Sequence, residues 1–316
     1  MAPPADPSLD KLLARLALTA ASEPDHFEGP PSSEDGVDAT FGGHFLGQAV
    51  VAANATVEQP PADEHQGRYL HSLHAYFLRG GRPGESFDIE VDRVRDGRSF
   101  CTRRVRTCQD PGKLQFELLA SYAAGAPESD TPELAPRPAI DLDDLPRPED
   151  LPSYGELMRS LDPLPLPEEW AFRDYGLDIR TIAAPWAPDG PTEHHGLRFW
   201  VRAKPGLVPS TNAATANLHA ALLAYQSDES LADCVAVPWG KTWGSPDVVF
   251  VSLDHAMWIH RPVDLDQWLL FDQEPIVVAR ERGLATASVW TADGQLVASV
   301  RQEALLRLGE LRLGDG

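Results

Sequence analysis

The sequence has little of what marks several large classes of protein. Its three cysteines, Cys101, Cys108 and Cys234, form an odd and sparse set without the paired spacing of a zinc site or a disulfide framework. No uninterrupted apolar stretch approaches the roughly 18–20 residues that a membrane-spanning helix needs. These absences argue against a disulfide-stapled secreted module, a metal centre and a membrane span.

Positive charge is also scarce. Lysine and arginine number 27 against 48 aspartates and glutamates, for a net charge of −21 and an isoelectric point of about 4.7. Such a surface repels nucleic acid and anionic lipid, so neither is an expected partner. The N-terminus has no basic region followed by an apolar one, as a signal peptide would, and the cysteine usage is typical of reduced thiols. We therefore expect a cytoplasmic protein.

The 316 residues suffice for one large domain or two ordinary ones, and periodicity predicts two kinds of element in the first third. Residues 8–22 repeat leucine at helical spacing behind a candidate serine cap. Residues 41–57 are small and apolar and predict a buried helix entered through a glycine turn. Alternating strands separated by glycine turns follow, at residues 73–78, 87–91, 99–105 and 114–118.

The second half repeats this order after a different kind of segment. Residues 126–168 are rich in proline and acid and are interpreted as a linker that wraps the surface. A strand pair at 177–182 and 196–203 then precedes an alanine- and leucine-rich helix at about 211–225. Further strands are expected at 248–259, 268–271, 276–282, 284–291 and 296–303.

Two pairs of matching positions indicate an internal duplication. His74-Ala75 and His255-Ala256 each open an aromatic-containing strand, 181 positions apart, and the turns Pro111-Gly112 and Asp293-Gly294 lie 182 positions apart. A long apolar helix wrapped by a curved antiparallel sheet is the hotdog arrangement. The prediction is an α+β double hotdog with repeats at 1–125 and 169–316. Chance similarity between two β-rich halves is the alternative.

Six blocks of sequence together carry a more specific signal. In the same order and over nearly the whole chain, they resemble the recurring blocks of the acyl-CoA thioesterase II family. Each block alone is weak evidence. The blocks are Phe41–Ala49, Tyr76–Arg79, Arg95–Phe100, Tyr225–Asp228, Asp254–Pro262 and Ala298–Glu303.

The resemblance implies a hydrolase of fatty acid metabolism that splits the thioester of acyl-CoA without a metal or other cofactor. Carried over by motif position, the family's catalytic aspartate, hydroxyl residue and glutamine correspond to Asp228, Ser252 and Gln302. The family more often has threonine at the second position, and serine keeps the hydroxyl but loses the methyl that limits rotation about χ1. Ser252 and Gln302 would orient a water, and Asp228 would take its proton or fix the orientation of the other two.

Gly43 and His44 are the expected substrate-binding residues. The glycines at 42 and 43 would let a helix N-terminus approach another backbone closely, since no lysine follows to make a phosphate loop. His44 departs from the family, which more often has glutamine there, and is either a substrate contact or simply a polar residue at the start of a helix. Arginines are densest at 79, 95, 98, 103 and 104, where they would meet CoA phosphates or pair with neighbouring acids.

Other readings of the same residues remain open. A Ser-His-Asp triad through Asp254 and His255 is disfavoured because strand neighbours face opposite sides, and His255 and His74 are expected to be hydrogen-bonding core residues. A hotdog hydratase would need an Asp-x-x-x-x-His pair on a hotdog helix, and neither helix carries one. A double hotdog that binds acyl-CoA without turnover is the non-enzymatic alternative.

Acyl chain length and the physiological substrate do not follow from residue identities. Because hotdog sheets have exposed edges, which such proteins commonly pair across a two-fold axis, we expect a homodimer or a dimer of dimers.

Overall fold

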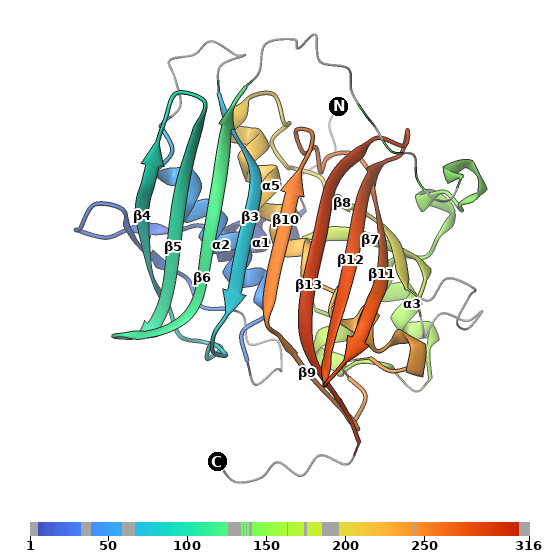
Figure 1. Cartoon of the computed structure of the whole chain (residues 1–316). Coiled ribbons are helices and arrows are strands. Elements are labelled where there is room, and N and C mark those ends of the chain that lie inside the picture. The colour runs from blue at the N-terminus through green and yellow to red at the C-terminus, as the bar shows by residue number, and fades with distance from the viewer. Residues whose placement is uncertain are drawn as a thin grey trace.

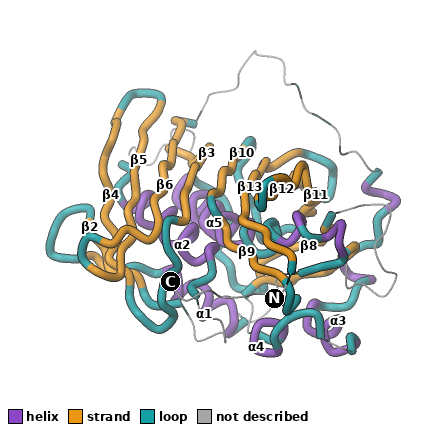
Figure 2. Tube along the Cα trace, turned by 60° about the horizontal axis from the view of Figure 1, so that its bottom comes forward, coloured by secondary structure: helices purple, strands orange, loops and turns teal. Residues whose placement is uncertain are grey.

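The structure is a computed structural model. It describes residues 6–32, 39–58, 67–125, 134, 136, 138, 141–162, 164–173, 176–184, 196–242 and 244–309. Within these residues, the strands form one large antiparallel sheet, and the helices lie behind it (Figure 1). In Figure 2, two helices lie directly against the sheet, α2 (Gly42–Ala55) and α5 (Ala213–Ser227). Three others lie farther out: α1 (Pro7–Leu16), α3 (Tyr154–Ser160) and α4 (Glu168–Ala171).

The first repeat has two helices and six strands. Its elements are α1 (Pro7–Leu16), β1 (Thr19–Ala20), β2 (His26–Gly29), α2 (Gly42–Ala55), β3 (Arg68–Phe77), β4 (Phe87–Asp96), β5 (Phe100–Asp110) and β6 (Lys113–Ala124).

The second repeat follows the same helix-then-sheet order after a connecting region. The connecting region holds η1 (Leu142–Asp144), η2 (Pro148–Asp150), α3 (Tyr154–Ser160) and α4 (Glu168–Ala171). The repeat itself comprises β7 (Leu177–Ala183), β8 (Leu197–Ala203), α5 (Ala213–Ser227), η3 (Asp233–Val235), η4 (Val237–Trp239), β9 (Val248–Ser252), β10 (Asp254–Ile259), β11 (Leu269–Ala279), β12 (Arg282–Thr291) and β13 (Leu296–Leu308).

The sheets of the two repeats are continuous. The strand order is β1-β2-β4-β5-β6-β3-β10-β13-β12-β11-β8-β7, with β9 paired to β13. The join is the antiparallel pair β3 and β10, in which Tyr76 lies opposite Asp254 and Ser72 opposite Trp258. The predicted double hotdog is therefore confirmed as one sheet wrapped around a pair of helices.

Helices α2 and α5 form the centre because small, apolar residues dominate both. Most of their residues are buried, as expected for a helix that packs on a sheet on one side and on another helix on the other. They run antiparallel: Gly43 approaches Tyr225, and Asn54 donates to the carbonyl of Asn217 at 3.1 Å. The N-terminus of each helix thus lies near the C-terminus of the other.

Three predicted boundaries are wrong. The helix expected over 8–22 ends at Leu16, because Ala17 is extended, and its cap is Asp6, whose carboxylate accepts the Ser8 amide at 2.8 Å. The strands expected at 268–271 and 276–282 are one strand, β11, with a pairing irregularity at Pro275.

The strand expected over 248–259 is interrupted at Leu253. Ser252 lies opposite Ala304, whereas Ala256 lies opposite Arg301, so the pairing with β13 shifts by one residue at this point. A bulge of this kind re-aims the side chains that flank it.

The predicted equivalence of His74 and His255 as matching positions of the two repeats is wrong by one residue. His255 is buried, whereas His74 is exposed on the outer face of the sheet, where its ring meets Trp258 edge-on at 5.2 Å. Strand side chains alternate with period two, so equivalent positions in two repeats must share a face. The offset of 182 between the turns at Gly112 and Gly294, both with positive φ, is retained.

The segment interpreted as a linker does more than wrap the surface. In its described part, α3 and α4 bury a small apolar cluster of their own, which includes Leu157, Met158, Leu166 and Trp170. The domain boundaries at 125 and 169 remain a prediction.

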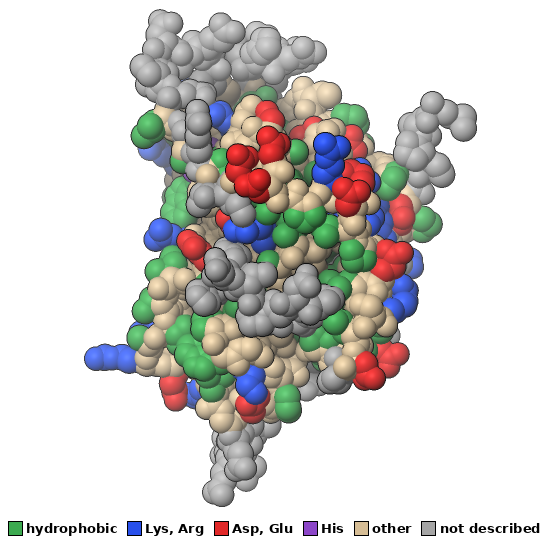
Figure 3. Space-filling view, turned by 90° about the vertical axis from the view of Figure 1, so that its right-hand side faces the viewer, with side chains coloured by type: hydrophobic (Ala, Val, Ile, Leu, Met, Phe, Trp, Pro, Cys, Tyr) green, Lys and Arg blue, Asp and Glu red, His purple; other side chains and the backbone are tan. Residues whose placement is uncertain are grey.

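One face of the molecule is mixed in charge. On the side of the molecule toward β7 and β11, acidic and basic side chains are interspersed with hydrophobic ones (Figure 3). None of the helices in the described residues is long and apolar enough to cross a membrane.

Candidate active site

Asp228 caps the C-terminal end of α5. It follows Ser227, has φ −87° and ψ −13°, and is only 7% exposed to solvent. Most side chains of the helix that precedes it are buried, so the carboxylate is carried into the interior, between α5 and the sheet.

Gln302 from β13 holds this carboxylate in place. Its Nε2 donates to Asp228 Oδ1 at 2.7 Å and to Ser252 Oγ at 2.8 Å. Gln302 is fully buried, and Ser252, at the end of β9, is half-buried. The structure thus brings together the three residues that the sequence blocks single out, Asp228, Ser252 and Gln302.

A buried histidine fixes the orientation of Gln302. His255 Nδ1 lies 3.3 Å from Gln302 Oε1, and His255 Nε2 lies 2.9 Å from Ser227 Oγ. Because both N–H groups of Gln302 are donated elsewhere, its oxygen must accept, which assigns the proton to Nδ1. Burial lowers the pKa of His255 to about 4, although its contact with Gln302 opposes this, so the ring is neutral near pH 7.

The expectation that His255 is a hydrogen-bonding core residue is confirmed, and the same expectation for the exposed His74 is wrong. No triad forms at Ser252, because His255 reaches Ser227 instead and Asp254 accepts the backbone amide of Glu303 at 2.8 Å.

The N-terminus of α2 approaches the carboxylate closely. The Gly43 N–H donates to Asp228. A Cβ on Gly42 would lie 2.5 Å from Asp228 Oδ2, and one on Gly43 would lie 2.2 Å from the Tyr225 carbonyl oxygen. Only glycine allows this approach, which confirms the expected reason for the glycine pair.

Burial dominates the electrostatics of Asp228. It raises the pKa of the carboxyl to about 7, against the opposing effect of hydrogen bonds from Gln302 and from the Gly43 amide. A carboxylate whose pKa lies near neutrality can act as a general base at physiological pH.

A pocket of about 220 Å³ opens onto these groups. Gly42, Asp228 and Ser252 line it, between aromatic walls supplied by Phe41, Trp170 and Phe250. The pocket therefore exposes the Asp228 carboxylate, the Ser252 hydroxyl and the N-terminus of α2 to whatever binds there.

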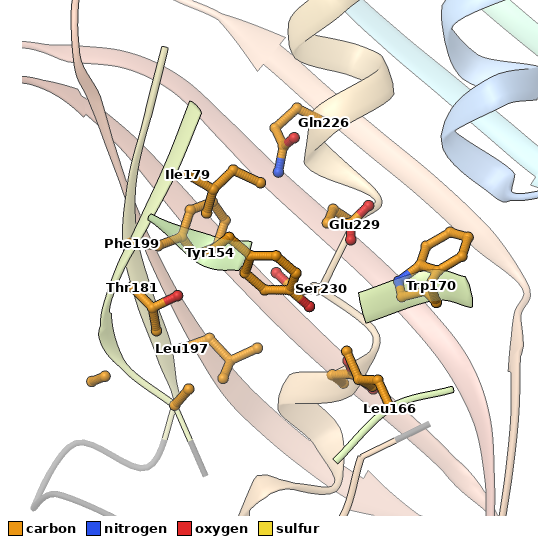
Figure 4. Close-up of a pocket in the computed structure, with 13 residues that line it drawn as sticks. Tyr154, Leu166, Trp170, Ile179, Thr181, Leu197, Phe199, Gln226, Glu229 and Ser230 are labelled. Atoms are coloured by element: carbon orange, nitrogen blue, oxygen red, sulfur yellow. The ribbon is translucent and has the colours of Figure 1, made fainter. Parts of the chain in front are cut away.

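Figure 4 shows a second, smaller pocket of about 40 Å³. The two share Trp170, Glu229, Ser230 and Asp233 among their lining residues. The second pocket lies between the C-terminal end of α5 and strands β7 and β8, where Ile179, Leu197 and Phe199 line it.

Two groups of expected binding residues lie elsewhere. His44 is buried against Phe87, with Nε2 3.2 Å from the Pro30 carbonyl oxygen, and lines neither pocket. Among the arginines, Arg103 is fully buried in an ion pair with Asp96, and Arg104 pairs with Glu117. These two arginines are therefore paired with neighbouring acids, one of the two alternatives left open for them.

The sequence interpretation expected His255 to hydrogen-bond in the core but did not identify its partners. Its contacts with Gln302 and Ser227 depend on a sheet register that spacing alone does not reveal. Gln226 was also passed over, although a polar residue inside an apolar helix is a visible signal.

Comparison with known proteins agrees with this geometry. Residues 30–123 match the model of the acyl-CoA thioesterase N-terminal domain, and residues 145–306 match that of the acyl-CoA thioesterase C-terminal domain. The chain is similar to acyl-coenzyme A thioesterase 8 of Mus musculus, with 31% identity over 284 residues that cover 85% of this chain and 80% of the mouse protein.

Solved structures show the same relationship. The crystal structure of the acyl-CoA thioesterase II TesB2 from Mycobacterium marinum has a TM-score of 0.68 and 30% identity, covering 97% of this chain and 99% of that one. A hot dog fold protein from Alicyclobacillus acidocaldarius, at 19% identity, has a TM-score of 0.67 over 94% of this chain and 98% of its own and shares the fold. The matched domains, the shared fold and the sequence identity together show that the chain belongs to the acyl-CoA thioesterase II family of double-hotdog thioester hydrolases.

Proposed function

We propose that this protein hydrolyses the thioester of acyl-CoA, releasing a carboxylic acid and CoA, and that Asp228, Ser252 and Gln302 carry the reaction. The observation behind the proposal is the pair of hydrogen bonds from Gln302 to Asp228 and Ser252 at the wall of an open pocket. Family membership supports the substrate class, and the geometry supports the roles.

A water held between Asp228 and Ser252 is the nucleophile. Asp228 removes one of its protons as its oxygen bonds to the thioester carbonyl carbon. The tetrahedral intermediate then collapses, the C–S bond breaks, and the leaving sulfur takes the proton back from Asp228. Gln302 has no N–H left for the water, so it acts by fixing the carboxylate and the hydroxyl in one geometry.

The N-terminus of α2 stabilises the developing negative charge on the carbonyl oxygen. Gly42 is the first residue of the helix and lines the pocket, and the first amides of a helix have no intrahelical acceptor. The helix dipole adds partial positive charge at the same place. A preorganised donor of this kind contributes roughly 3–4 kcal/mol of transition-state stabilisation.

The test is release of free thiol from acyl-CoAs of several chain lengths by the parent and by Asp228→Asn. We expect turnover by the parent at some chain length and a loss of about 10³-fold in kcat/KM in the variant, since general base catalysis typically supplies 10²–10⁴-fold. Asp254→Asn is the matched control, because its side chain can still accept the Glu303 amide.

Turnover that survives Asp228→Asn would keep the reaction and remove the assigned base. No release at any chain length would contradict the hydrolytic function and favour a binding protein.

We further propose that the protein is a cytoplasmic homodimer or dimer of dimers. Its three cysteines are free thiols, which suits a reducing compartment. The outer face around the join of the repeats exposes Tyr76, Leu119 and Trp258, an apolar group that a second copy would cover. Light scattering would test the assembly, and a 34.5 kDa species would contradict it.

A further inference from the structure

Gln226 is a buried side chain that the hydrolytic mechanism does not use. It lies in the last turn of α5 and is fully buried, yet neither its Nε2 nor its Oε1 has a hydrogen-bond partner among the residues that the structure describes. A buried amide without partners is strongly disfavoured in a folded protein. A ligand that supplied the missing partners would remove that penalty.

The side chain points into the second pocket. In Figure 4 the carboxamide projects from α5 into the space bordered by Tyr154, Ile179 and Phe199. The pocket holds about 40 Å³, room for a few atoms, since one water needs roughly 10–15 Å³ on the same kind of measure. A small group at the end of a ligand therefore fits, close to the amide.

The pocket is placed to receive the acyl group of a bound thioester. It shares four lining residues, Ser230 among them, with the pocket that contains Asp228 and Ser252. Gln226 precedes Asp228 by two residues on the same helix end. An acyl-CoA with its carbonyl carbon at Asp228 would thus extend its chain toward Gln226.

The chemistry of the lining identifies the group. An alkyl chain would pack on Leu197 and Phe199 but would leave the amide without partners. A hydroxyl is both donor and acceptor, so it can pair with the amide as a carbonyl oxygen cannot. A carboxylate is disfavoured, because Asp233 lines the same space and Glu229 is already paired with Arg173.

We propose that Gln226 binds a hydroxyl group on the acyl chain and thereby makes hydroxyacyl-CoAs the preferred substrates. This inference rests on the proposed thioesterase function and assigns its substrate class. Gln226 is then a specificity-determining residue, whereas Asp228 performs the chemistry.

The experiment compares hexanoyl-CoA with hexanoyl-CoAs that carry one hydroxyl at carbon 3, 4, 5 or 6. The readout is the ratio of kcat/KM between each hydroxylated substrate and hexanoyl-CoA. We expect a ratio of about 10 or more for at least one position in the parent, because a site built to pair a hydroxyl discriminates against the analogue that lacks it. In Gln226→Leu that ratio should fall by at least tenfold.

Thermal melting of the same variants supplies a readout that does not depend on turnover. Gln226→Leu should raise Tm, since leucine removes an amide without partners. The matched control is Gln48→Leu on α2, where the buried amide donates to the carbonyls of Arg15 and Pro30, both at 2.9 Å. That variant should lower Tm and leave the selectivity ratio as it is.

Two results would overturn the inference. One is equal selectivity in the parent and Gln226→Leu at every hydroxyl position. The other is a fall in Tm for Gln226→Leu as large as that for Gln48→Leu, which would show that the amide is already satisfied. A parent that releases no thiol from any of the five substrates would instead contradict the thioesterase function, and the melting comparison would still decide the state of Gln226.

Discussion

The C-terminal capping residues of the two central helices are each bound by a side chain from the sheet, but the side chains differ. Thr56 is the C-cap of α2 and Asp228 is the C-cap of α5. In each repeat a long polar side chain from the sheet hydrogen-bonds to the capping residue. Arg103 donates to Thr56 Oγ1 at 2.9 Å, and Gln302 donates to Asp228 Oδ1 at 2.7 Å. Arg103 lies on the first strand of the β5–β6 hairpin, whereas Gln302 lies on the second strand of the equivalent β12–β13 hairpin.

The register supports this equivalence. Arg103 pairs with Ala120 between β5 and β6, and Ala285 pairs with Gln302 between β12 and β13, each 182 positions later. In the first repeat the guanidinium also reaches the Thr56 carbonyl and Asp96, so the cluster is closed. In the second repeat the neutral amide leaves a carboxylate facing a pocket.

The N-termini of the two central helices also differ in how their first amides are satisfied. At the start of α5, Asn212 and Thr215 form a capping box that satisfies the first amides. The start of α2 has no side-chain cap, and Gly43 donates to Asp228 instead. Duplication has thus produced one helix end that stabilises the fold and one that keeps its polar groups for a ligand.

Replacing Gln302 should produce the largest difference between the two clusters. Gln302→Met retains the volume but releases Asp228 and Ser252, so kcat/KM should fall by about 10²-fold as positioning is lost. Thiol release by the purified variant measures this, with a melting curve to confirm folding. Activity within threefold of the parent would mean that Gln302 does not organise the site.

Replacing Arg103 should have the opposite effect, lowering stability while leaving activity unchanged. Arg103→Met removes several charge-assisted hydrogen bonds and should lower the free energy of unfolding by about 2–4 kcal/mol. The remaining folded protein should turn over normally. Urea denaturation measures the loss, and Arg104→Met, a half-exposed neighbour paired with Glu117, should cost at most about 1 kcal/mol. Equal losses in the two variants would contradict the role of the closed cluster.

The second cluster should titrate near neutrality. The pKa of Asp228 is raised from 3.8 to about 7 in the folded chain. The folded state therefore retains a proton that the unfolded chain releases above pH 4, and stability falls as pH rises from 4 to 7. Asp228→Asn should melt higher than the parent above pH 7, and this advantage should vanish near pH 4.

The same shift predicts how the parent's activity depends on pH. Because the base must be deprotonated, kcat/KM should rise as pH passes through about 7 and then level off. A profile that is flat between pH 5 and 8 would argue against Asp228 as the base.

The smallest effect on activity should come from replacing Ser252 with threonine. Ser252→Thr restores the residue more common in the family, and its methyl limits rotation about χ1. We expect kcat/KM to change by no more than a few-fold, with an increase favoured. Ser252→Ala, measured in parallel, should cost more because Gln302 loses its second acceptor.

Much of this arrangement could be predicted from the sequence. Alternating polarity and glycine turns located most strands, and the small apolar stretches at 41–57 and 211–225 located both central helices. Asp228 and Gln302 could be found because each lies inside a recognisable block, and Ser252 because it lies two residues before one. The trio is clustered in the structure, whereas its catalytic role remains to be measured.

The rest depended on register, which residue identities do not encode. The bulge at Leu253 lets both Ser252 and His255 face Gln302, although an uninterrupted strand would place them on opposite faces. The one-residue error at His74 has the same origin. Similarly, nothing in the sequence alone shows that the amide of Gln226 faces a pocket.

The closed cluster at Thr56 and Arg103 also leads us to expect a particular number of ligands per chain. A symmetric pair of single-repeat chains would present the same helix end twice and would bind two acyl-CoA molecules. Here the guanidinium occupies one of the two equivalent places, so titration of the protein should saturate at one equivalent per chain.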